Sequence, residues 1–368
     1  MQNNTLDTRL YPLQLEEKIR TLRDSFSAFE LPDIEVFESP VSHFRMRSEF
    51  RMWHKGDQVS YVMFANTREK TPYDVTDFPI GSVLMNEKMK LLLEALNADA
   101  SLRHKLYQAE FLTTRSGEAM VTLVYHRPLD EAWLARAQAL SKQIDLLIIG
   151  RSRGQKLAAS RDYVIETMQV DGREYRYQQI ESGFTQPNAV VCEKMLNWAV
   201  NNTRDLGGDL LELYCGNGNF TLPLSANFNK VMATELSKPS VNSALFNIAL
   251  NGIDNIAIGR LSSEEFVQAL DKVRPFNRLS HVNLDDYQFS TVFVDPPRAG
   301  LDPATTAVTQ RFDNIIYISC NPETLKTNLE TITRTHDIRA FAAFDQFPYT
   351  HHLECGVILK KRQEPANP

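Results

Sequence analysis

A strand–loop–helix pattern that repeats from about residue 180 constrains the fold of this 368-residue chain more than any other feature. Six short apolar segments occur there, and the first three are each followed by a loop and a helical segment: 210–214, 230–235, 255–261, 290–298, 314–320 and 354–361. Apolar strands that alternate with helices are typical of a parallel sheet covered on both faces. The sequence therefore predicts a doubly wound, Rossmann-like α/β domain over residues 179–368.

The first half of the chain has a different pattern of polar and apolar residues. Residues 44–64 alternate polar and apolar side chains, with Lys55-Gly56-Asp57 as a turn between two strands. Further segments predict an amphipathic helix within residues 1–30, helices at 84–107 and 129–143, and strands at 118–126 and 144–150. We expect residues 1–178 to form a separate N-terminal α+β domain.

Composition limits the classes of protein to consider. The chain has 40 Lys and Arg against 46 Asp and Glu, a formal net charge of -6, so it is not a protein that coats nucleic acid non-specifically. Its four cysteines are Cys192, Cys215, Cys320 and Cys355, without a C-x-x-C pair, which argues against a zinc or iron–sulfur site. Reduced cysteines, no signal peptide and no long apolar run predict a cytoplasmic protein without a membrane span or metal.

The segment "ELYCGNGNF" (212–220) falls where a parallel sheet binds ligands, after a strand and before a helix. Gly216 and Gly218 permit a tight turn, and Glu235 follows at the end of the next strand, where a carboxylate can accept hydrogen bonds from ribose hydroxyls. No third glycine and no phosphate-binding lysine follow. This combination fits a nucleoside without a pyrophosphate, such as S-adenosylmethionine.

Three residues near strand ends carry the candidate chemistry. Asp295 ends the strand in "VFVDPPRAG", and Cys320 ends the strand in "YISCNPETL", where a helix N-terminus would favour a nucleophilic thiolate. Glu354 precedes the last strand and is expected at the same edge as Cys320. The other three cysteines fit small buried apolar residues better.

One reaction needs this combination. Carbon 5 of uracil is a poor nucleophile, and addition of a thiolate at carbon 6 makes it nucleophilic enough to accept a methyl group. A base must then remove the carbon 5 proton so that the thiol can leave. The reaction requires one thiol and one general base but no metal.

Five segments together resemble the RNA uridine-5 methyltransferases, in particular their tRNA-specific branch. They are "GFTQPN" (183–188), "LELYCGNGNF" (211–220), "VDPPRAGL" (294–301), "ISCNPETL" (318–325) and "HHLECGV" (351–357). The resemblance implies Cys320 as nucleophile, Glu354 as base and S-adenosylmethionine as cofactor. It implies cofactor contacts from Gln186, Tyr214, Asn219, Glu235 and Asp295.

The same resemblance implies a substrate. The family's tRNA enzymes modify the T-loop uridine, uridine 54, to 5-methyluridine, and transfer-messenger RNA (tmRNA) has a similar loop. Related ribosomal RNA enzymes typically carry an N-terminal four-cysteine iron–sulfur site, and this chain has no cysteine before Cys192. We therefore expect the T-arm of tRNA, and also tmRNA, as partners, without an iron–sulfur cluster or an obligate protein partner.

An RNA surface is expected in the N-terminal domain. "FRMRSEFRMWH" (44–54) interleaves aromatic residues with Arg45, Arg47 and Arg51, and alternation would place these arginines largely on one strand face. An ordinary exposed strand face would have the same pattern. The basic stretch "GRSRGQKLAASR" (150–161) is either a phosphate-contacting strip or a solvated loop.

Three alternatives remain open. A ribosomal RNA uridine-5 enzyme would use the same mechanism on another substrate. A non-catalytic tRNA-binding or folding factor would not need Cys320 and Glu354. A methylase of exocyclic amines would use a motif like Asp295-Pro-Pro, but its motif usually ends in an aromatic residue, whereas this one ends in Arg298.

Overall fold

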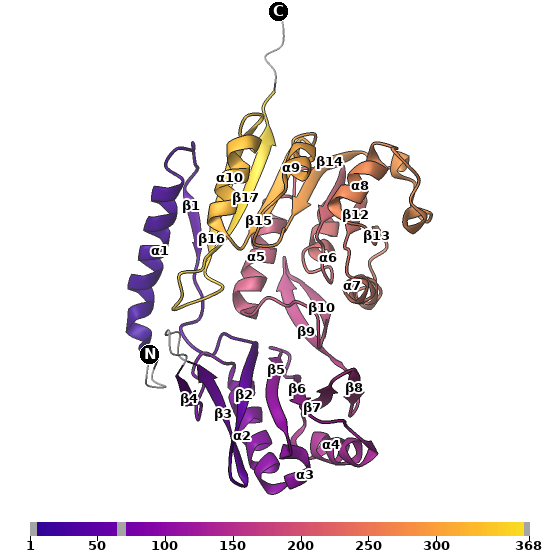
Figure 1. The fold of residues 1–368 in the computed structure, drawn as a ribbon. Helices are drawn as coiled ribbons and strands as arrows, with labels where there is room; N and C mark the ends of the chain where they lie inside the picture. Colours follow the sequence, from indigo (N-terminus) through magenta and orange to yellow (C-terminus); the bar gives the residue numbers. More distant parts are fainter. Residues whose placement is uncertain (1–5, 65–70, 364–368) are drawn as a thin grey trace, which may run out of the picture. The chain divides into compact units, whose positions relative to one another are not determined.

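A computed structural model describes residues 6–64 and 71–363 of the chain (Figure 1). The chain folds into two compact units, each built from segments that are separated in the sequence. The first unit contains Pro40–Thr167 and Gln178–Ala189; the second contains Leu10–Ser39, Met168–Tyr177 and the described residues from Val190 onward. The expected division lay between residues 178 and 179. The observed division differs mainly because Leu10–Ser39 groups with the C-terminal segments.

The second unit is built on an eight-stranded sheet. In spatial order its strands are β1 (Ile34–Phe37), β16 (His336–Phe344), β17 (Glu354–Lys361), β15 (Asn314–Ser319), β14 (Phe289–Val294), β11 (Asp209–Leu213), β12 (Val231–Thr234) and β13 (Ile256–Gly259). Neighbouring strands are parallel except at β17, which runs antiparallel to both β15 and β16. The predicted Rossmann-like α/β class is confirmed, but the expectation of a wholly parallel sheet is wrong at this strand.

The antiparallel direction of β17 is explained by the short loop before it. β16 was not predicted, and only nine residues connect it to β17. A parallel connection needs a crossover of a dozen or more residues, so two strands joined by so short a loop form a hairpin. The amino end of β17 therefore lies at the same edge of the sheet as the carboxyl ends of the parallel strands.

Helices cover both faces of this sheet. One face packs against α1 (Tyr11–Ser25), α8 (Ser263–Leu270), α9 (Pro303–Thr309) and α10 (Pro322–Ile332) in a single apolar core. On the other face lie α5 (Ala189–Asn201), α6 (Thr221–Leu224) and α7 (Lys238–Leu250). There the Trp198 ring of α5 meets Phe344 of β16 edge-on at 5.6 Å. Because the strands are buried on both sides, they read as nearly continuous apolar runs.

The first unit is an α+β structure, as expected. Its seven-stranded sheet has the order β4 (Pro72–Asp74), β3 (Gln58–Phe64), β2 (Arg47–Lys55), β5 (Leu106–Thr113), β6 (Ala119–Tyr125), β7 (Leu147–Ser152) and β8 (Gln155–Ala158). Three helices pack on one face: α2 (Val83–Ala98), α3 (Ala100–Arg103) and α4 (Glu131–Ile144). A hairpin of β9 (Tyr163–Val170) and β10 (Arg173–Ile180) follows, and the division between the units passes through it.

The predicted helix at 84–107 is too long. α2 ends at Ala98 because the Asp99 side chain accepts hydrogen bonds from the backbone N–H groups of Ser101 and Leu102, which caps the short α3 instead. β5 then begins at Leu106. Among the described residues, no helix is both long and apolar enough to cross a membrane.

Candidate active site

Four residues named from the sequence lie at one edge of the eight-stranded sheet. Tyr214 follows β11, Glu235 follows β12, Asp295 follows β14 and Cys320 follows β15. These strands are hydrogen-bonded neighbours that run in the same direction, so their carboxyl ends lie together. Ligands of open α/β sheets bind at such an edge.

Glu354 reaches this edge from the opposite direction. It is the first residue of β17, and the antiparallel register pairs Ser319 of β15 with Cys355 of β17. Cys320 directly follows Ser319, Glu354 directly precedes Cys355, and the charge of Glu354 acts on the Cys320 thiol. The hairpin partner of Glu354 on its other side is Phe344. The sheet therefore brings the thiol and the carboxyl side by side.

The turn that carries Cys320 is held by its neighbours. Asn321 caps α10 by accepting a hydrogen bond from the Glu323 backbone N–H at 3.2 Å, and Pro322 occupies the first helical position. The Asn321 side-chain amide also donates to the Arg298 carbonyl oxygen at 3.0 Å. Cys320 is only half-buried, whereas the other three cysteines are buried, as the sequence suggested.

The site concentrates negative charge in a poorly solvated place. Burial raises the pKa of Asp295 to about 7, although this side chain keeps some exposed surface. Burial, and then the charge of Asp295, raise the pKa of Glu354 to about 8. The pKa of the Cys320 thiol is raised to about 11 by burial and by both carboxylates, while the Arg298 guanidinium acts in the opposite direction.

The glycine loop forms a cradle next to Glu235. Gly216 has φ +57°, and a Cβ added there meets no atom within 4 Å, so the loop backbone borders open space. The backbone of Tyr214 also adopts the left-handed conformation, with φ +63°, which is strained for a residue with a side chain. Glu235 accepts hydrogen bonds from the backbone N–H groups of Gly216 at 3.1 Å and Ser237 at 2.7 Å. The carboxylate is thereby fixed at the mouth of the loop.

Two predicted cofactor contacts are placed differently. The Asn219 side-chain amide lies against the Cys192 sulfur of α5, with Nδ2 at 3.5 Å. Gln186 belongs to the first compact unit and not to the unit that contains the sheet edge. Its Oε1 atom is buried without a hydrogen-bond partner among the described residues.

Sequence reasoning missed Glu212. This residue lies within β11 and is 1% exposed, and one of its carboxyl oxygens, Oε2, is buried without a hydrogen-bond partner in the described part of the chain. Burial, opposed by Thr221 and reinforced by Asp295, raises its pKa to about 8. The signal was present as a single acidic residue inside the apolar run "LLELY".

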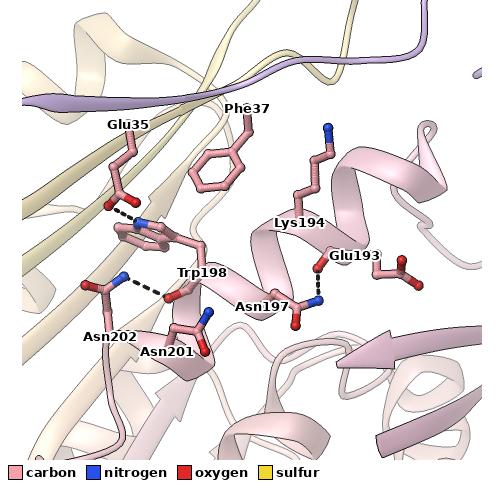
Figure 2. A pocket seen from close by; sticks show the side chains of 8 residues that line it. All are labelled: Glu35, Phe37, Glu193, Lys194, Asn197, Trp198, Asn201 and Asn202. Carbon is pink, nitrogen blue, oxygen red and sulfur yellow. Dashed lines mark hydrogen bonds between the residues drawn. The ribbon is translucent and has the colours of Figure 1, made fainter. Parts of the chain in front are cut away.

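A pocket elsewhere in the second unit contains none of the predicted site residues (Figure 2). Its volume is about 360 Å³, and it lies between β1 and α5. The Trp198 indole N–H donates to Glu35 at 2.8 Å, and the Lys194 ammonium donates to the Glu38 carbonyl oxygen at 2.7 Å. Asn197 and Asn202 donate to backbone carbonyls of α5. Trp198 and Lys194 thus connect α5 to β1 and the residue that follows it.

No group of three or more His, Cys, Asp or Glu side chains within residues 6–64 and 71–363 is arranged to hold a metal ion. His351 and His352 are adjacent, and His352 Nδ1 lies 3.3 Å from the Arg298 guanidinium.

In the first unit, the sheet face opposite α2–α4 is hollowed. Two depressions of about 570 and 380 Å³ share Arg45, Ser48 and Glu49 in their walls. The larger is also lined by Arg51, whose guanidinium lies 3.5 Å from the centre of the Tyr107 ring. Phe44 and Phe50, two of the aromatic residues of the segment 44–54, are buried in the protein.

The basic stretch 150–161 is largely neutralised within the first unit. Arg151 pairs with the buried carboxylate of Glu181, and Lys156 contacts Asp162 at 2.6 Å. Arg161 pairs with Glu118 at 2.6 Å. These contacts argue against a phosphate-contacting strip. The alternative of a solvated loop is also wrong for much of the stretch, which belongs to β7 and β8.

Comparison with known proteins supports one family. A family model described as tRNA (Uracil-5-)-methyltransferase matches residues 10–362. The chain is 61% identical over 363 residues to a tRNA/tmRNA (uracil-C(5))-methyltransferase of Cellvibrio japonicus, covering 98% of this chain and 99% of that protein. It is 55% identical over 364 residues to the protein of the same name from Teredinibacter turnerae, covering 98% and 100%.

A solved structure shares the fold. The crystal structure of Pyrococcus abyssi tRNA (uracil-54, C5)-methyltransferase in complex with S-adenosyl-L-homocysteine has a TM-score of 0.71 and 20% identity, over 95% of this chain and 83% of that chain. The match to the family model and the two curated relatives each extend over nearly the whole chain. The chain therefore belongs to the tRNA (uracil-5-)-methyltransferase family.

Proposed function

We propose that this protein transfers a methyl group from S-adenosylmethionine to carbon 5 of uridine 54 in the T-loop of tRNA, giving 5-methyluridine, and that it acts on the equivalent uridine of tmRNA. The main support for this proposal is that Cys320 and Glu354 each adjoin the paired residues Ser319 and Cys355 at one sheet edge. Family membership and the names of the relatives support the substrate. The cytoplasm, where tRNA is found, is the proposed place of action.

The residues at the sheet edge fit the cofactor. Glu235 is fixed by two backbone N–H groups and retains lone pairs for the two ribose hydroxyls. The open space beside Gly216 leaves room for the nucleoside. We propose that Tyr214, Asn219, Glu235 and Asp295, together with Gln186, hold S-adenosylmethionine.

Cys320 begins the proposed reaction. The half-buried thiol releases its proton to solvent, which the nearby Arg298 charge favours, and the sulfur forms a bond to carbon 6 of the uracil. The electron pair of the 5,6 double bond moves toward the carbon 4 oxygen and makes carbon 5 nucleophilic. Carbon 5 then takes the methyl group that bound S-adenosylmethionine would supply, with S-adenosylhomocysteine as the other product.

Glu354 completes the proposed reaction. Its carboxylate takes the proton from carbon 5, and the electron pair of that C–H bond re-forms the 5,6 double bond. The carbon–sulfur bond breaks and its electron pair returns to Cys320. A pKa of about 8 suits this step, because general bases work best when their pKa lies near the working pH.

The hollowed face of the first unit is the proposed RNA surface. Unpaired loop bases are recognised by stacking and by hydrogen bonds to their edges. Arg51 over Tyr107 and the Tyr107–His126 stack at 4.0 Å offer flat surfaces, while Glu49 and Gln108 in the wall of the larger depression offer polar contacts. Withdrawal of the target base from the folded loop would accompany binding.

The first experiment is methylation of an unmodified tRNA transcript, followed by digestion to nucleosides and mass spectrometry. We expect 5-methyluridine, and none when uridine 54 is replaced by cytidine. Product on ribosomal RNA alone would identify ribosomal RNA, and not tRNA, as the substrate. No product on any RNA would favour a non-catalytic tRNA-binding factor.

A second experiment tests the covalent step. Transfer RNA that contains 5-fluorouridine has no carbon 5 proton to remove, so the adduct should persist and survive denaturing electrophoresis. Peptide mapping should locate the adduct at Cys320, and Cys320→Ala should abolish it while it retains tRNA binding. An adduct at another residue, or unchanged methylation by Cys320→Ala, would contradict the proposal.

A further inference from the structure

The loop between β16 and β17 ends directly before the proposed base. It consists of residues 345–353, and Glu354 is the next residue. Glu354 is 3% exposed, so its carboxyl has little freedom once the loop is fixed. A base that must meet one proton on a bound uracil depends on the exact course of this loop. The groups that hold the loop therefore bear on the reaction.

Lys18 of α1 holds the loop at both ends. Its side chain is 5% exposed, and its ammonium donates hydrogen bonds to the Asp345 carboxylate at 2.7 Å, the Phe347 carbonyl at 3.0 Å and the His352 carbonyl at 2.9 Å. An ammonium group has three N–H donors, and all three are used on this loop. The last contact lies two residues before Glu354.

Two further residues of α1, Gln14 and Tyr11, also contact this loop. Gln14, one turn before Lys18, accepts a hydrogen bond from the Tyr349 backbone N–H at 2.6 Å. Its amide also lies 3.4 Å from the Thr350 carbonyl oxygen. Tyr11, about one turn earlier again, packs its ring 5.9 Å from the Tyr349 ring. Tyr349 has φ +64°, a strained left-handed conformation that needs such outside support.

Anchoring of α1 does not require these polar contacts. Leu15, Ile19 and Leu22 already bury the apolar face of the helix in the core of the second unit. Burial of an ammonium group is unfavourable, because the charge leaves water. Consistent with this, burial lowers the pKa of Lys18 even though Asp345 opposes the change. A buried lysine directed entirely at one loop therefore points to a role in that loop.

We infer that α1 positions the proposed general base: Lys18, assisted by Gln14, holds the 345–353 loop so that Glu354 meets the carbon 5 proton after methyl transfer. Lys18 acts through the loop and does not touch the substrate, so it is a positioning residue. The inference rests on the proposed function, since only that reaction has a separate step that needs Glu354.

The test compares two RNAs with the full-length protein. Formation of the adduct on 5-fluorouridine tRNA needs Cys320 but not the base, whereas turnover on normal tRNA needs both. We expect Lys18→Met to form the 5-fluorouridine adduct at close to the parent rate, but to lower kcat on normal tRNA by about 10- to 100-fold, with little change in KM. A methylated protein–RNA complex should accumulate on normal tRNA.

Lys88→Met is the matched control. Lys88 is likewise a buried lysine, and its ammonium donates to the Ile144 carbonyl oxygen at 3.0 Å, but it lies in the first unit. This variant should show no separation between adduct formation and turnover. Gln14→Ala removes the contacts of Gln14 with Tyr349 and Thr350 but keeps Lys18, and it should show the same separation as Lys18→Met in a milder form. If Lys18→Met does not fold, Gln14→Ala alone is used to test the inference.

Two results would overturn the inference. One is an equal loss of adduct formation and turnover in folded Lys18→Met or Gln14→Ala, which would indicate a purely structural role. The other is normal turnover without accumulated complex. If the parent protein forms no adduct on 5-fluorouridine tRNA, the proposed function itself fails, and the two failures are thereby distinguished.

Discussion

Replacement of Glu354 by Gln should stabilise the protein even as it stops turnover. In the folded protein, burial and the charge of Asp295 raise the pKa of this carboxyl to about 8, against an ordinary value of 4.5. At pH 7 the unfolded chain has lost a proton that the folded protein still holds. Stability therefore decreases as pH rises from about 4.5 to about 8, and Glu354→Gln removes this dependence because Gln does not titrate.

The magnitude follows from these values. At pH 7 the carboxyl of the unfolded chain is about 2.5 pH units above its pKa, and each unit corresponds to about 1.4 kcal/mol. Glu354→Gln should thus be more stable than the parent by up to about 3 kcal/mol at pH 7, and by little at pH 5. For a unit of this size, 3 kcal/mol corresponds to an increase of roughly 6–12 °C in Tm.

Thermal melting of both proteins between pH 5 and pH 9 measures this difference. Glu330→Gln in α10 is a suitable control, because Glu330 is exposed and its replacement should leave a small and constant difference. A difference between Glu354→Gln and the parent that does not grow from pH 5 to pH 8 would refute the reasoning. It would mean that Glu354 is already ionised in the folded protein.

Three further predictions concern other parts of the molecule. Glu235→Gln should weaken binding of S-adenosylhomocysteine by about 10- to 100-fold in calorimetry, because charge-assisted hydrogen bonds to the ribose contribute about 1.5–3 kcal/mol; unchanged affinity would remove Glu235 from the cofactor site. Gly218→Ala should lower Tm more than Gly216→Ala, because both have positive φ but only an added Cβ at Gly218 meets a neighbour, at 2.6 Å; equal melting temperatures would argue against this packing. Arg151→Ala should lower Tm without weakening tRNA binding, because it removes the nearer cation from the buried Glu181 carboxylate and leaves Lys156 at 3.4 Å, at a cost of at most about 3 kcal/mol; a loss of affinity at unchanged Tm would restore the phosphate-contacting interpretation.

Local sequence patterns were sufficient to locate six of the eight strands of this sheet, but not β16 or the antiparallel direction of β17. Each predicted strand carries a run of apolar residues because it is buried on both faces, and such runs are visible without knowledge of neighbours. The expected position of Cys320 beside Glu354 has a similar basis, since one residue ends a strand and the other begins one. The chemical roles of these residues stay predictions until they are tested.

Long-range contacts were not accessible in the same way. β1 pairs with β16, so that Ile34 lies beside Phe341. The sequence of neither strand indicates which other strand it pairs with. The ion pairs of the basic stretch 150–161 could not be predicted for the same reason. Their acidic partners Glu118 and Glu181 lie outside the stretch in the sequence. Glu212 was overlooked because its importance depends on burial beside Asp295, which only the assembled sheet provides.

The grouping of Leu10–Ser39 with the C-terminal segments has a consequence for biosynthesis. α1 and β1 leave the ribosome early, yet their packing partners in β16 and the 345–353 loop are translated more than 300 residues later. Translation at about 5–20 residues per second leaves the apolar face of α1 uncovered for tens of seconds. During that interval the helix is a natural target for chaperones, and a ribosome that stalls before β16 releases a chain whose first helix has nothing to pack against.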